Sequence, residues 1–77
     1  MKIPPGLYHH YKDKTKLYDV MGVAFQTETE EELVVYRPLY EVEHEFFARP
    51  LAMFLENVDV PELGYSGPRF VFVREKQ

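Results

Sequence analysis

The chain has 77 residues, enough for one domain (1–77) with a single small core, and its six tyrosines and six phenylalanines must supply much of the core volume. It contains no cysteine, which excludes disulfides and thiol catalysis. The net charge of −4 argues against wholesale wrapping of nucleic acid, and no apolar run reaches the roughly 20 residues that cross a bilayer. We therefore expect a cytoplasmic protein that does not bind membranes.

The first two strands are predicted near the N-terminus. Residues 6–11 and 16–25 are rich in Tyr, Val and Leu, and the polar run 12–15 separates them. This pattern is typical of a β-hairpin. Gly22 interrupts the second strand and indicates a bulge or a tight bend.

The third strand is predicted over residues 32–40, where apolar side chains alternate on two partly buried faces. Pro38 has no backbone donor, so it must lie at an edge, a bulge or a corner where pairing changes. A shorter strand is expected over 45–49.

The remaining elements follow Pro50, a residue that favours the start of a helix. Leu51, Phe54 and Leu55 have the spacing of one apolar helical stripe, which predicts one or two turns. Residues 58–60 are expected to be extended, 64–68 form a predicted turn cluster, and 69–74 form the final strand.

This order of elements predicts a mostly β fold of about five strands with one short helical turn. No helix is long enough for a crossover between parallel strands, so a small SH3-like antiparallel β-barrel is the favoured architecture. A five-stranded OB-type barrel is the alternative, but it usually has a longer helix between its third and fourth strands.

Four blocks of the sequence together resemble a known family. They are Gly6-x-Tyr8-x-His10-Tyr11-Lys12, Tyr18-x-Val20-x-Gly22-Val23-Ala24, residues 32–40 (ELVVYRPLY), and Phe47-Ala48-Arg49-Pro50-Leu51-x-Met53-Phe54 with Arg69-Phe70. In this order they resemble the small bacterial family called domain of unknown function 1653. The resemblance implies a compact SH3-like barrel and no established activity. The family usually has Gly where this chain has Asp13, and Trp where it has Phe47, which lacks the indole donor.

No catalytic or metal-binding constellation is predicted. His9 and His10 are adjacent on a strand, so their side chains leave opposite faces, and His44 has no second His nearby in sequence. The only serine, Ser66, lies in a Gly-Pro turn, and the acidic run 28–32 is typical of a solvated turn. We therefore predict no metal, no cofactor and no catalytic residue. A small-ligand-binding or hydrolytic enzyme remains an alternative, because a fold does not determine an activity.

The predicted function is a non-enzymatic interaction module. Aromatic residues are more numerous than so small a core obviously requires, and arginines and a histidine lie among them. An aromatic surface beside a guanidinium can stack a base, grip a peptide or clamp an acidic group. The competing interpretation is that these rings fill the core. The predicted binding residues are Tyr8, His10, Tyr36, Arg37, Tyr40 and Arg49.

The charge distribution favours a protein or peptide as the partner. Acids predominate over residues 26–62, where the only basic residues are Arg37 and Arg49. Nucleic acid is the alternative partner, through the turn from Lys12 to Lys16, and its binding would weaken steeply with salt. Self-association of the chain through an exposed edge strand is a third arrangement.

Overall fold

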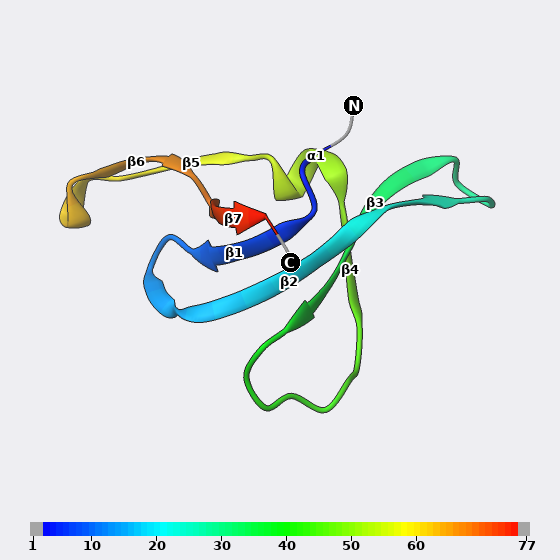
Figure 1. Ribbon diagram of the computed structural model, residues 1–77. Coiled ribbons are helices and arrows are strands. Elements are labelled where there is room, and N and C mark those ends of the chain that lie inside the picture. The colour runs from blue at the N-terminus through cyan, green and yellow to red at the C-terminus, as the bar shows by residue number, and fades with distance from the viewer. Residues whose placement is uncertain (1–2, 76–77) are drawn as a thin grey trace.

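The computed structural model describes residues 3–75 and is dominated by β-strands (Figure 1). One helix and one 3-10 helix interrupt the strands. The elements in chain order are β1 (Gly6–His10), β2 (Asp13–Gln26), β3 (Glu31–Pro38), β4 (Phe47–Pro50), α1 (Leu51–Phe54), β5 (Asn57–Val60), η1 (Pro61–Leu63), β6 (Tyr65–Pro68) and β7 (Phe70–Glu75).

The strands form two antiparallel sheets. The larger sheet has five strands in the order β4-β3-β2-β1-β7, and β5 and β6 form a separate two-stranded sheet. The prediction of a mostly β fold with one short helix is confirmed, although seven strands replace the five expected. Within residues 3–75, β4 and β7 are the two ends of the larger sheet, and the strand pairing does not close it into a barrel.

The predicted hairpin is formed by β1 and β2, with a shorter turn than expected. Its turn is Tyr11–Lys12, and β2 already begins at Asp13 rather than at residue 16. The Asp13 carboxylate accepts a hydrogen bond from the backbone N–H of Thr15 at 2.9 Å, which fixes the first residues of the strand. The bulge predicted at Gly22 is confirmed, because the register of β2 against β3 shifts between Val20 and Gly22.

Pro38 ends β3, where its missing donor costs no sheet hydrogen bond. It is opposite Tyr18 of β2, whereas β4 pairs only with the part of β3 from Leu33 to Tyr36. Pro38 therefore lies past the end of β4 at a sheet edge, as the sequence predicted.

The segment after β4 follows the prediction at its start and departs from it later. Pro50 precedes α1, and Leu51 and Phe54 are buried, but Leu55 is 38% exposed and ends the apolar stripe early. The prediction of a turn cluster over residues 64–68 is wrong for residues 65–68, because these residues form β6 and pair with β5. The chain reverses instead through η1 and Gly64, which has a left-handed φ of 62° that glycine adopts without steric cost.

The core lies between the larger sheet and α1, which packs against β3 and β4. Aromatic side chains form most of it, as the composition predicted. The buried apolar residues are Ile3, Tyr8, Tyr18, Val20, Val34, Tyr36, Leu51, Phe54 and Phe70. Three segments extend beyond this core in Figure 1: the β5–β6 hairpin, the β2–β3 hairpin and the loop between β3 and β4.

Candidate functional site

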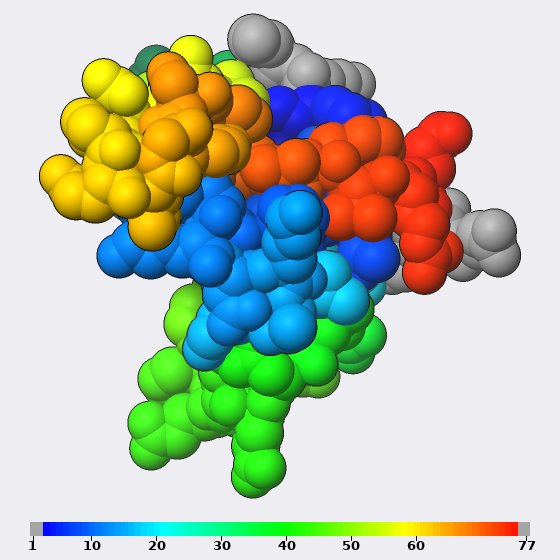
Figure 2. Space-filling view, turned by 90° about the vertical axis from the view of Figure 1, so that its left-hand side faces the viewer, coloured from blue at the N-terminus to red at the C-terminus, as the bar shows by residue number. Residues whose placement is uncertain are grey.

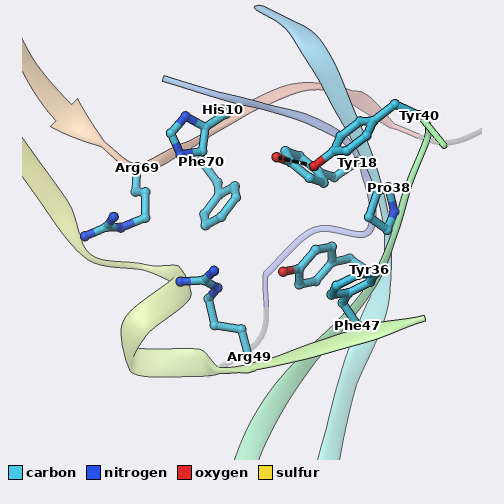
Figure 3. A pocket seen from close by; sticks show the side chains of 9 residues that line it. All are labelled: His10, Tyr18, Tyr36, Pro38, Tyr40, Phe47, Arg49, Arg69 and Phe70. Atoms are coloured by element: carbon cyan, nitrogen blue, oxygen red, sulfur yellow. Dashed lines mark hydrogen bonds between the residues drawn. The ribbon is translucent and has the colours of Figure 1, made fainter. Parts of the chain in front are cut away.

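A pocket of about 330 Å³ opens between the two ends of the five-stranded sheet. Its walls come from β1, β2, β3, β4 and β7, with one residue from the loop after β3 and one from the junction between β6 and β7 (Figure 3). The lining residues are His10, Tyr18, Tyr36, Pro38, Tyr40, Phe47, Arg49, Arg69 and Phe70. In the surface view of Figure 2, the β5–β6 hairpin and the loop after β3 project from opposite ends of the molecule, with the β1–β2 turn between them.

Strand register explains why these side chains face one another. Residues directly opposite in an antiparallel ladder point to the same face of the sheet. Arg49 is opposite the fully buried Val34, and Phe47 is opposite the buried Tyr36, so both β4 side chains lie on the inner face. By the same reasoning, His10 lies on the inner face because it is opposite the buried Phe70.

Aromatic rings form the wall on the β2–β3 side of the pocket. The Tyr18 ring meets the Tyr36 ring edge-on at 5.6 Å between centroids, and Phe47 is stacked on Tyr36 at 5.9 Å. The hydroxyls of Tyr18 and Tyr40 are 3.2 Å apart and share a hydrogen bond. Burial, and then the hydrogen bond with Tyr40, raise the pKa of Tyr18, so this phenol remains protonated at neutral pH.

Two guanidinium groups lie on the opposite side of the pocket. The Arg49 Cζ is 5.4 Å from the centroid of the Phe70 ring, a cation–π contact. The Arg69 Nη2 is 3.2 Å from the Glu56 Oε1, and its backbone N–H donates to the Glu56 carbonyl at 3.0 Å. The Arg69 Nε is buried and has no hydrogen-bond partner within residues 3–75.

His10 completes the polar part of the lining. Its Nδ1 accepts a hydrogen bond from the Lys12 backbone N–H at 3.2 Å, so the neutral ring carries its proton on Nε2. Burial, followed by the charges of Arg69, Lys12 and Arg49, lowers the pKa of His10 below its ordinary value. The imidazole is therefore neutral at pH 7 and offers a donor.

The lining contains donors and aromatic faces but no carboxylate. Two guanidinium groups, an imidazole N–H and two phenol protons can donate hydrogen bonds, because one proton of the Tyr18 and Tyr40 hydroxyls forms the bond between them, while the ring faces provide apolar contact. Such an arrangement can hold a group that combines acceptor oxygens with an apolar body.

The structure brings together four of the six predicted binding residues: His10, Tyr36, Tyr40 and Arg49. Tyr8 lies elsewhere, in the core, where it is 5% exposed and its hydroxyl donates to the Pro4 carbonyl at 2.8 Å.

Arg37 also lies outside the pocket. It is opposite Asp19 in the ladder, and its Nη2 is 3.8 Å from the Asp19 Oδ2 on the outer face of the sheet.

Arg69 and Phe70 are pocket residues that the sequence-based site did not include. They form an Arg-Phe pair at the start of the last strand, which carries no local signal of a site. Only the pairing of β7 with β1 places Phe70 beside His10. Tyr18 and Phe47 are also pocket residues outside the predicted site, although both lie in the sequence blocks that resemble the family.

Lys16, the last residue of the segment proposed for nucleic-acid binding, lies on β2 at the rim of the same pocket. The Lys16 Nζ is 4.6 Å from the centroid of the Tyr40 ring, and Lys16 itself is exposed. Lys16 and the aromatic pocket therefore share one surface.

Residues 3–75 contain no cluster of three or more His, Cys, Asp or Glu side chains that could hold a metal ion. Among the same residues, no helix has both the length and the apolar character needed to span a bilayer.

Comparison with known proteins agrees with the resemblance seen in the sequence. The model of the family described as protein of unknown function (DUF1653) matches residues 6–72. A crystal structure of a protein belonging to DUF1653 from Bordetella bronchiseptica superposes with a TM-score of 0.83 at 34% sequence identity, covering 97% of this chain and 92% of that one. None of the curated proteins matches this sequence. The four sequence blocks, the fold and the family match all agree. The chain therefore belongs to the DUF1653 family of proteins of unknown function.

Proposed function

We propose that this domain is a non-enzymatic interaction module of the cytoplasm that binds a protein or peptide partner in the pocket between β4 and β7. The observation that carries the proposal is the position of Arg49, whose guanidinium lies over Phe70 in the lining of a pocket that Tyr36, Tyr40 and Phe47 also wall. A cation beside apolar ring faces is an arrangement that anchors peptide side chains.

The proposal includes the finer fold class, an SH3-like barrel. The five-stranded sheet is curved enough for its two end strands to approach each other. Arg49 of β4 contacts the ring of Phe70 of β7 across the pocket, which supports this class. The binding pocket would then occupy the gap between the two ends of the barrel wall.

The test is an affinity capture from bacterial lysate, with the bound protein and nucleic acid analysed together at low and high salt. Tyr40→Ala is a suitable site variant because Tyr40 is 37% exposed, whereas Tyr36 is 6% exposed and its truncation would disturb the core. Arg49→Gln is the second site variant. Arg37→Gln is the matched control, since Arg37 lies on the outer face of the sheet.

We expect a salt-resistant protein that the parent and Arg37→Gln capture and that Tyr40→Ala and Arg49→Gln lose. Capture of the same proteins by all four chains would refute the proposal. Each variant is first checked by circular dichroism for an unchanged fold.

A second candidate function, nucleic-acid binding, is supported by Lys16 at the pocket rim over the Tyr40 ring. It predicts nucleic acid that is recovered at low salt and lost at high salt, because neutralised phosphates release counterions. Lys14→Gln combined with Lys16→Gln would abolish that recovery and leave a salt-resistant protein partner bound.

Self-association through an edge strand belongs to the same set of proposals. The outer edges of β4 and β7 are the ends of the five-stranded sheet within residues 3–75. Light scattering coupled to size exclusion, over a range of protein concentrations, distinguishes a monomer from a dimer.

A further inference from the structure

The chemistry of the pocket specifies its ligand more closely than an interaction module in general, and this inference rests on the proposed function. Every charged or strongly polar side chain in the lining is a hydrogen-bond donor, and the Asp and Glu residues that dominate the rest of this acidic chain are absent from it. The lining therefore favours a ligand that supplies acceptors or negative charge.

Arg49 carries the uncompensated charge. Its guanidinium is turned toward the pocket in Figure 3, and no carboxylate of residues 3–75 forms an ion pair with it. The Phe70 ring contacts the guanidinium on one side and Arg49 is partly buried. An anion entering the pocket would therefore meet a cation that is only partly hydrated, where attraction exceeds that at an open surface.

The neighbouring donors add hydrogen bonds and little net charge. Arg69 is paired with Glu56, so the pair is neutral, and its buried Nε still lacks an acceptor within residues 3–75. His10 is neutral and holds its proton on Nε2. In Figure 3 the Tyr36 hydroxyl points into the pocket, toward the side on which the Arg49 guanidinium lies.

The charges of the lining residues total about one positive unit, which matches a monoanion; Lys16 at the rim is exposed, where water and salt screen its charge. A carboxylate has this charge at neutral pH, whereas a phosphate monoester carries about −1.5 to −2. A carboxylate is also planar with two acceptor oxygens, the geometry that a guanidinium binds with two parallel hydrogen bonds.

The rings argue against a stacked nucleobase as the ligand. Tyr18, Tyr36 and Phe70 are 7%, 6% and 6% exposed, respectively, and are packed against one another, so they present no free face. The more accessible rings of the lining are Tyr40, which is exposed, and Phe47, which is partly buried. They can contact an apolar group next to the anion.

We propose that the pocket binds a single carboxylate of a peptide partner, with the carboxylate on the Arg49 guanidinium and an adjacent apolar side chain against Tyr40 and Phe47. A terminal carboxylate and an acidic side chain share this chemistry. Ligands of both kinds are compared in the test below.

The test is a titration of the isotope-labelled domain, followed by the NMR signals of the Arg49 and Arg69 Nε–H groups and of the His10 ring. The probes are N-acetyl-phenylalanine, its neutral amide, phenyl phosphate, and an acetyl-Glu-Phe-amide dipeptide whose only carboxylate is the side chain. We expect saturable shifts with the two carboxylates and none with the neutral amide. The carboxylate probe that binds more tightly shows whether the partner supplies a terminal carboxylate or an acidic side chain.

Arg49→Gln should weaken carboxylate binding by about tenfold or more, because a charge-assisted hydrogen-bond pair is lost. Arg37→Gln is the matched control and should bind as the parent does. The comparison of the acid with its amide on the parent protein decides the question even if Arg49→Gln unfolds.

Equal binding of the acid and the amide, tighter binding of phenyl phosphate, or the absence of shifts at Arg49 would each overturn the inference. If the domain captures a partner from lysate through the pocket but binds neither carboxylate probe, this inference alone is overturned. Carboxylate binding in a domain that captures no partner would overturn the proposed function alone.

Discussion

Phe54→Ala should destabilise the domain severely, because Phe54 joins the helix to the aromatic core beneath the pocket. Phe54 is 2% exposed, and its ring is stacked on Phe70 at 4.5 Å with an interplanar angle of 2°. It also meets Tyr8 edge-on at 5.4 Å. Truncating a buried phenylalanine costs about 3–5 kcal/mol through lost transfer energy and the cavity left behind. Because these rings support one another, we expect the upper half of that range.

The expected effect is large for a chain of 77 residues. Native proteins have a free energy of unfolding of about 5–15 kcal/mol, and in a domain of this size each kcal/mol lost lowers Tm by about 4–8 °C. Phe54→Ala should therefore lower Tm by about 16 °C or more. Urea and thermal unfolding followed by circular dichroism measure both quantities.

Phe25→Ala is the matched control, because the Phe25 side chain is 59% exposed on the β2–β3 hairpin. It should change the free energy of unfolding by less than about 0.5 kcal/mol. Phe54→Leu retains most of the apolar volume and loses the ring pairs, so it should cost about 1–2 kcal/mol. Stabilities of Phe54→Ala and Phe25→Ala within about 1 kcal/mol of each other would refute this account of the core.

Three further predictions concern single groups. Tyr8→Phe removes the hydrogen bond to the Pro4 carbonyl and should cost about 1 kcal/mol in urea unfolding; an unchanged midpoint would show that the bond contributes nothing. The pKa of His10 lies below 6.5, so the unfolded chain binds the proton more tightly. The contribution of neutral His10 to the free energy of unfolding is therefore complete above about pH 6.5. It declines as the pH falls through the pKa of His10 in the folded protein. His10→Gln should flatten this decline in urea midpoints measured from pH 7.5 to 5, and an identical pH profile would contradict the assignment. Gly64→Ala forces a side chain into a left-handed turn with φ of 62° and should cost about 1–2 kcal/mol by thermal unfolding, whereas Ala at the exposed Ser66 should be neutral.

Local sequence patterns determined most elements of the fold. Two segments rich in Tyr, Val and Leu on either side of the polar run 12–15 predicted the β1–β2 hairpin, and Gly22 marked a bulge or a tight bend. Pro38 marked an edge, bulge or corner of the sheet and Pro50 a helix start, since a residue without an N–H can occupy few positions. These features depend on a few neighbouring residues, so the sequence alone could show them.

The strand over residues 65–68 could not be predicted in this way. Its Ser-Gly-Pro composition is typical of a turn, yet it pairs with β5 through contacts formed only after η1 reverses the chain. A strand with weak intrinsic preference forms when a partner strand satisfies its backbone groups.

The sequence by itself determined that the chain is a small, mostly β member of the DUF1653 family with arginines among aromatic rings. It contains the Arg-Pro pair twice, as Arg37-Pro38 and Arg49-Pro50, and nothing local distinguishes the two arginines. The tertiary structure decided that Arg49 faces the pocket and Arg37 the outer surface. The reason is strand register: Arg49 is opposite the buried Val34, Arg37 is opposite Asp19, and a shift of one residue would exchange the two faces.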